Sequence, residues 1–94
     1  MDQYDLWKDT MLIVNTDHGF LLGEHGWWGE TVMPMYDEIA HTPLFLYDPR
    51  LPECGGEHRS SIVQTIDLAP SLLEFFGVEI PRGMQGKPAA EVFR

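Results

Sequence analysis

The chain has 94 residues, a formal net charge of −9 and one cysteine, Cys54. Its few Lys and Arg residues cannot form the basic patch that holds a phosphate backbone, so we expect no nucleic-acid partner. One cysteine excludes an internal disulfide, and the lack of an 18-residue apolar run predicts no membrane span. The N-terminus has no signal-peptide pattern, which leaves the localisation unknown, with the cytoplasm as the default expectation.

The first half of the chain predicts two short strands separated by a loop and a helix. Residues 4–8 predict the end of a helix, and the apolar run at 11–14 is typical of a strand covered on both faces. Residues 19–31 carry four glycines and no steady period, which predicts a long functional loop. Pro34 is placed to begin a helix that ends near residue 40, because Pro43 disfavours helical geometry before it.

The second half predicts a strand, a surface loop and a helix. Residues 44–47 predict a second strand, and the order strand, loop, helix, strand predicts a right-handed parallel crossover within one sheet. Residues 51–61 predict a surface loop. Asp67 is expected to cap a helix that Gly77 terminates, with its inward face formed by Leu68, Leu72, Leu73, Phe75 and Phe76. We therefore expect an α/β fold in a single small domain over residues 1–94.

Polar side chains follow the first strand at once, in the order Thr16-Asp17-His18-Gly19. Ligands bind beyond the carboxyl ends of strands in open α/β sheets, and Asp17 and His18 offer a divalent cation one oxygen and one nitrogen. Taken alone, such a pair is more often a turn cap and an ordinary loop histidine. On the next loop, His25 is a candidate to contact a substrate, with a histidine that has no role as the alternative. Glu24 could orient His25, although a solvated carboxylate is the favoured interpretation.

The surrounding motifs resemble those of sulfatases, which belong to the alkaline phosphatase superfamily. The resemblance extends over residues 9–86 and rests on Thr-Asp-His-Gly (16–19), Gly-Glu-His-Gly (23–26), Tyr-Asp-Glu (36–38), Thr-Pro-Leu-Phe-Leu (42–46) and Ile-Asp-Leu-Ala-Pro-Ser-Leu-Leu (66–73). It implies a fragment of a three-layer α/β/α fold with mostly parallel strands, from the C-terminal part of a catalytic domain. The implied activity of the parent enzyme is metal-dependent hydrolysis of sulfate monoesters.

In such an enzyme Asp17 and His18 would supply half of the metal shell. Calcium is usual in the family, while a histidine at this position keeps Mn²⁺ or Zn²⁺ open. The family's nucleophile, a Cys or Ser oxidised to formylglycine, lies far upstream of this region, and the surroundings of Cys54 do not match its motif. We therefore expect the isolated chain to be inactive. The cation would also offset the chain's negative charge toward a sulfate ester.

The chain departs from the family at Glu30, where sulfatases usually place a Lys that contacts the sulfate. The reversed charge indicates either a degenerate member, which we favour, or a site in which another cation takes the place of the Lys. Asp37 and Glu38 are interpreted as structural residues. Two alternatives stay open: a fragment of a metal-dependent phosphonate or phosphodiester hydrolase of the same fold, and a free-standing binding protein without catalysis. A partial sheet would also expose an edge and an apolar face, which predicts self-association.

Overall fold

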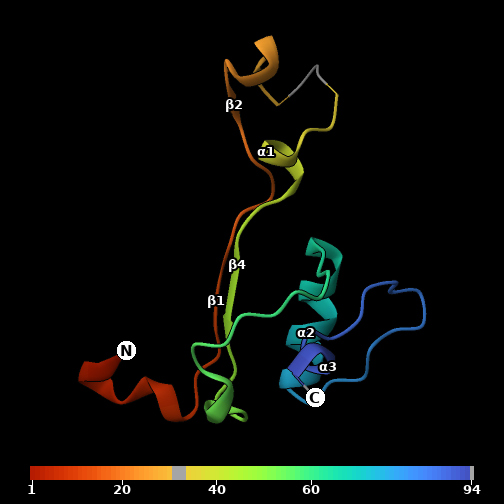
Figure 1. Cartoon of the computed structure of the whole chain (residues 1–94). Coiled ribbons are helices and arrows are strands. Elements are labelled where there is room, and N and C mark those ends of the chain that lie inside the picture. The colour runs from red at the N-terminus through yellow and green to blue at the C-terminus, as the bar shows by residue number, and fades with distance from the viewer. Residues whose placement is uncertain (31–33, 94) are drawn as a thin grey trace. The chain divides into compact units, whose positions relative to one another are not determined.

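The computed structural model describes residues 1–30 and 34–93, which divide into two compact units, Met1–Arg50 and Leu51–Arg94 (Figure 1). The first unit contains strands β1 (Leu12–Asn15), β2 (Leu21–Leu22), β3 (Trp28–Gly29) and β4 (Leu44–Tyr47) and helix α1 (Asp37–Ala40). The second contains helices α2 (Leu68–Phe75) and α3 (Ala90–Phe93). Within the described ranges, every helix is too short or too polar to cross a bilayer.

Strands β1 and β4 lie side by side and pair in antiparallel fashion (Figure 1). The prediction of two strands was confirmed, but that of a parallel crossover was wrong. A parallel pair needs a connection that carries the chain back along the whole strand, whereas this connection holds a hairpin and a four-residue helix. In the register, Val14 faces Phe45 and Ile13 faces Leu46, so both faces of the pair are apolar.

The N-terminal segment packs against β4 through one tyrosine. Two 3₁₀ turns, η1 (Asp2–Tyr4) and η2 (Leu6–Lys8), replace the predicted helix end, and Asp5 between them has a positive φ of 54°. The Tyr47 hydroxyl donates a hydrogen bond of 2.7 Å to the Trp7 carbonyl, and the two rings meet edge to face at 4.8 Å. These contacts hold the start of the chain beside the sheet.

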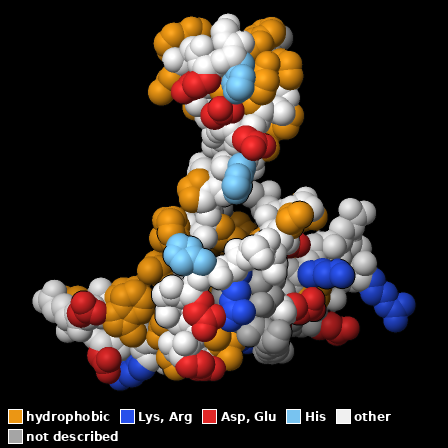
Figure 2. Space-filling model, in the orientation of Figure 1, with side chains coloured by type: hydrophobic (Ala, Val, Ile, Leu, Met, Phe, Trp, Pro, Cys, Tyr) orange, Lys and Arg blue, Asp and Glu red, His pale blue; other side chains and the backbone are white. Residues whose placement is uncertain are grey.

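Residues 19–31 were predicted to be an irregular loop, and this was wrong in one respect. Strands β2 and β3 form a short antiparallel hairpin there, with Leu22 facing Trp28. Strands of two residues are too short to produce a period, so the sequence did not reveal them. Leu21 is fully buried, while Trp28 is 72% exposed. Figure 2 shows apolar side chains in orange at the surface around this hairpin, with histidines and carboxylates among them.

Helix α1 begins at Asp37 rather than at Pro34 as predicted, because Tyr36 is still extended (φ −95°, ψ 159°). It ends at Ala40, as predicted. The backbone of Gly19 lies directly against this helix: its N–H donates a hydrogen bond of 2.7 Å to the Ile39 carbonyl. A Cβ on Gly19 would lie 1.5 Å from the Glu38 carbonyl oxygen, so only glycine fits at this contact.

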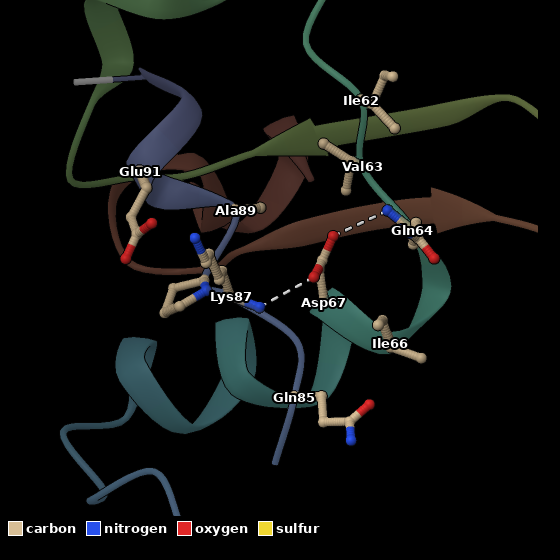
Figure 3. Close-up of a pocket in the computed structure, with 10 residues that line it drawn as sticks. Ile62, Val63, Gln64, Ile66, Asp67, Gln85, Lys87, Ala89 and Glu91 are labelled. Carbon is tan, nitrogen blue, oxygen red and sulfur yellow. Dashed lines mark hydrogen bonds between the residues drawn. The ribbon is translucent and has the colours of Figure 1, made fainter. Parts of the chain in front are cut away.

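In the second unit, Asp67 does not cap α2 through its side chain, which corrects the prediction. It is the last residue of the 3₁₀ turn η5 (Thr65–Asp67), and its carboxylate accepts the backbone N–H groups of Gln64 (2.8 Å) and Lys87 (2.9 Å) (Figure 3). The Asp67 side chain is used in a capping box with Gln64 at the start of η5, which explains why it does not cap α2. The buried Ser71 hydroxyl accepts the N–H of Ala89 at 2.8 Å. Both contacts tie the segment before α3 to the start of α2.

The outer face of α2 differs from the prediction. Leu72 and Phe76 are 42% and 73% exposed, although the helical period placed them inward. The residues that α2 buries are Pro70 and Ser71, which lie against the segment leading into α3. Gly77 adopts the left-handed conformation expected of a terminator (φ 71°).

Candidate functional site

The turn after β1 places Asp17 and His18 side by side. The His18 backbone N–H donates to Asp17 Oδ1 at 2.8 Å, and the His18 Nδ1 atom bonds the Gly19 carbonyl at 2.9 Å. Asp17 Oδ2 and His18 Nε2 are 3.6 Å apart, and both side chains are exposed. Thr16 supports the turn through weak hydroxyl contacts of 3.3 Å to Asp17 Oδ1 and the His18 carbonyl.

These contacts shift the pKa values of both groups. The hydrogen bond from the His18 backbone N–H, assisted by the His18 imidazole, holds the pKa of Asp17 below its usual value. The hydrogen bond to the Gly19 carbonyl raises the pKa of His18, and the carboxylates of Asp17 and Glu30 add to this effect. Glu30, which is half-buried, therefore lies within electrostatic reach of His18.

The donor set of this turn fits part of a cation site. When Nδ1–H donates to Gly19, the neutral imidazole keeps its lone pair on Nε2, which is the usual arrangement of a metal-binding histidine. A separation of 3.6 Å allows Nε2 and Asp17 Oδ2 to reach one ion at the usual ligand distances of about 2.0–2.4 Å. Among the described residues no group of three or more His, Cys, Asp or Glu side chains is placed to hold a metal. The fit is thus that of a half-shell.

His25 lies at the far end of the same connection and contacts helix α1. Its Nε2 atom is 3.1 Å from each Glu38 carboxylate oxygen, and its ring stacks on Tyr36 with centroids 3.9 Å apart and planes 5° apart. The backbone of His25 is left-handed (φ 60°, ψ 12°). Glu24, the predicted orienting residue, accepts the Leu22 backbone N–H instead.

The structure thus joins some of the predicted site residues and leaves others apart. Asp17 contacts His18, and Glu30 acts on His18 electrostatically. Within residues 1–30 and 34–91, no contact joins His25 to that pair; the His25 ring meets Tyr36 and Glu38. Sequence reasoning had not assigned these two a role at the site. The Tyr-Asp-Glu motif was their only signal.

A pocket in the second unit holds different chemistry. Its volume is about 300 Å³, and Figure 3 shows Asp67, Lys87 and Glu91 among its lining residues. The Asp67 carboxylate that faces it is already engaged by two backbone N–H groups. None of the predicted site residues lines this pocket, so the candidate site is confined to the first unit.

Comparison with known proteins identifies the class. The family model for the C-terminal region of N-sulphoglucosamine sulphohydrolase matches residues 23–94. A solved structure of a protein in complex with its substrate D-glucosamine-2-N,6-O-disulfate superposes on 97% of the chain and 18% of its own, with a TM-score of 0.82 and 34% identity. The chain belongs to the sulfatase family and corresponds to its C-terminal region, which confirms the resemblance found in the sequence.

Individual relatives place the chain more closely. It is 38% identical over 86 residues to an N-acetylglucosamine-6-O-sulfatase of Bacteroides thetaiotaomicron, covering 88% of this chain and 15% of the relative. It is 33% identical over 86 residues to human arylsulfatase K, covering 92% and 15%. It is also 31% identical over 87 residues to the multifunctional alkaline phosphatase superfamily protein PehA of Trinickia caryophylli, covering 93% and 16%. The chain therefore spans about a sixth of the length of these relatives.

Proposed function

We propose that this chain provides one side of the active site of a metal-dependent sulfatase that hydrolyses a sulfate monoester. The observation that carries the proposal is the Asp17–His18 turn, whose Nε2 and Oδ2 atoms lie 3.6 Å apart while Nδ1 is held by the Gly19 carbonyl. Relatives named as sulfatases support the reaction class, and the sulfated amino sugar bound to the structural neighbour supports a sulfated sugar as substrate.

Asp17 and His18 would hold a divalent cation, with calcium expected and Mn²⁺ or Zn²⁺ as alternatives. When bound, such an ion neutralises the charge of the ester's non-bridging oxygens. The chain's own contribution is to orient the two ligands. The Asp17 carboxylate is kept ionised by the His18 backbone N–H, and the His18 ring is aimed by its bond to Gly19.

His25 would meet the ester or its leaving oxygen. Its Nε2 is engaged by Glu38, and its Nδ1 has no partner within the described residues. Nδ1 is therefore the atom that can accept or deliver a proton at the substrate. This role needs the rest of the active site, so the 94-residue chain alone is expected to be inactive.

Glu30 is the residue whose substitution tests the proposal most directly. A carboxylate about 4 Å from a sulfate oxygen would cost roughly 4 kcal/mol at an effective dielectric of about 20. The negative charge of Glu30 instead adds to the effects of the Gly19 carbonyl and Asp17 that raise the pKa of the His18 imidazole. We propose that Glu30 does not bind the ester and that this copy is a degenerate member with reduced activity.

A second candidate is a phosphonate or phosphodiester hydrolase of the same fold. The likeness to PehA, a multifunctional superfamily member, favours keeping it. The two candidates differ in the nucleophile, which in the family lies upstream of this region, so a Cys/Ser-x-Pro/Ala-x-Arg motif in the sequence that precedes residue 1 in the parent protein would favour the sulfatase.

The test is a graft of residues 9–86 into the matching segment of the Bacteroides N-acetylglucosamine-6-O-sulfatase. Metal content and turnover of sulfate and phosphate esters are measured for the graft and for its Asp17→Asn and Glu30→Lys variants. The proposal expects a lower metal content and activity in Asp17→Asn, and activity about a hundredfold or more higher in Glu30→Lys. A graft whose metal content is unchanged by Asp17→Asn would overturn the metal assignment.

A further inference from the structure

We propose that Glu38 is the positioning residue for His25. Its carboxylate holds Nε2 and so presents Nδ1 as the ring atom that meets the substrate. The catalytic benefit of holding the ring rests on the proposed function of His25. The contacts that hold the ring are all within the first unit. We call the three residues His25, Tyr36 and Glu38 the imidazole clamp.

Two contacts of different kind fix the ring completely. Stacking on Tyr36, with planes 5° apart and centroids 3.9 Å apart, sets the plane of the imidazole. The two 3.1 Å distances to the Glu38 oxygens set its rotation within that plane. Neither contact alone would do both. Tyr36 immediately precedes α1 and Glu38 is its second residue, so the two contacts come from one short segment.

The backbone of His25 supports the same conclusion. A left-handed conformation is uncommon for a residue other than glycine, and it persists where surrounding contacts determine it. Gly23 lies two residues before His25 and Gly26 follows it directly, and both also have positive φ. Between them, a histidine occupies a position whose backbone conformation favours glycine. The side chain therefore does something at this position that glycine would not.

The carboxylate selects one tautomer of the neutral ring. An ionised Glu38 only accepts hydrogen bonds, so the neutral imidazole must carry its proton on Nε2 and its lone pair on Nδ1. When the ring gains a proton, it gains it on Nδ1. Proton exchange with a substrate is thus confined to Nδ1, while Nε2–H stays with Glu38 in both states.

The competing reading is an incidental surface ion pair. Both side chains are 41% exposed, and such pairs contribute little to stability. A surface pair of that kind would leave the tautomer close to the preference of a free imidazole, because solvent competes for both ring nitrogens. Measuring the His25 tautomer therefore distinguishes a positioning role of Glu38 from an incidental ion pair, whereas measuring the stability of the chain does not.

The experiment records ring ¹⁵N shifts of His25 in the labelled 94-residue chain at a pH where the imidazole is neutral. We expect the Nε2–H tautomer to be populated almost exclusively in the unmodified chain, beyond the excess that a free imidazole already shows, and this added preference to be lost in Glu38→Gln, since an amide can donate or accept. Asp37→Asn, which removes the same charge one residue away on α1, is the matched control and should leave the tautomer unchanged. A dominant Nδ1–H form in the unmodified chain would overturn the proposal before any variant is made.

Activity of the graft separates this inference from the proposed function. We expect Glu38→Gln to lower kcat by about 10–100-fold with little change in KM, and to add nothing in a His25→Ala background. If His25→Ala leaves turnover unchanged while the tautomer still depends on Glu38, the clamp stands and the catalytic role of His25 falls. If the tautomer is the same in Glu38→Gln as in the unmodified chain, the clamp falls.

Discussion

Alanine at Gly19 would place a methyl group inside the backbone of α1. Its Cβ would lie 1.5 Å from the Glu38 carbonyl oxygen, so the turn and the helix must separate by about 1.5 Å to reach the closest contact that real Cβ atoms show. That movement breaks the hydrogen bond of 2.7 Å from the Gly19 N–H to Ile39. Overpacking costs about 1–3 kcal/mol and the lost bond about 0.5–1.5 kcal/mol, which together predict a loss of about 1.5–4.5 kcal/mol.

Thermal unfolding followed by tryptophan fluorescence measures this loss, because all three tryptophans lie in the first unit. For a domain of this size the midpoint should fall by roughly 6–36 °C. Gly26→Ala is the matched control: nothing lies within 4 Å of its added Cβ, and its φ of +76° adds only a backbone cost of about 1–2 kcal/mol. If Gly19→Ala is no less stable than Gly26→Ala, the contact between the turn and α1 does not exist as described.

Three further outcomes follow from other contacts. Gly86→Ala should cost about 1–3 kcal/mol in a circular-dichroism melt, since its Cβ would lie 2.0 Å from a carbonyl oxygen of η5, whereas Gly83→Ala, with open space around it, should stay within about 0.5 kcal/mol. Ser71→Ala should cost about 1–3 kcal/mol by urea denaturation, because a buried backbone N–H before α3 loses its acceptor, and an unchanged midpoint would refute this. Hydrogen bonds from its own backbone N–H and then from His25 hold the pKa of Glu38 below its usual value. The stability that ionised Glu38 adds to the folded chain is therefore present above its unfolded-state pKa and is lost as the pH falls through its folded-state pKa. A ¹³C titration should show the Glu38 midpoint rising in His25→Gln; a midpoint that does not move would contradict the bond.

The elements that the sequence predicted well are those set by local chemistry. The strand at 44–47 was found at its full length, because an apolar run ends there at Asp48-Pro49. The direction of its pairing was not predictable in this way, since it depends on the path of the intervening 28 residues, 16–43. The exposure of Leu72 and Phe76 was missed for a similar reason: a helical period identifies an apolar face but not what covers it.

In the candidate site, too, contacts between neighbours in the sequence could be predicted and contacts between distant residues could not. Asp17 and His18 are neighbours in the chain, so a strand end was sufficient to predict their proximity. His25 and Glu38 are 13 residues apart, and their contact depends on a left-handed backbone at His25 and on the late start of α1 at Asp37. Neither feature has a signal in the residue types. Glu24, the nearer carboxylate, was therefore the wrong candidate to orient His25.

Helix α1 has only four residues, yet two separate points of the chain before it are attached to it: Gly19 through its backbone and His25 through its side chain. Substitutions at these two attachments should be epistatic, because moving the helix away from one alters the other. The smallest portable piece of this site is consequently not the Asp-His motif but the continuous stretch of residues 16–40. An engineer who transplants Asp17 and His18 into another scaffold without α1 would import the ligands and leave behind the part that aims them.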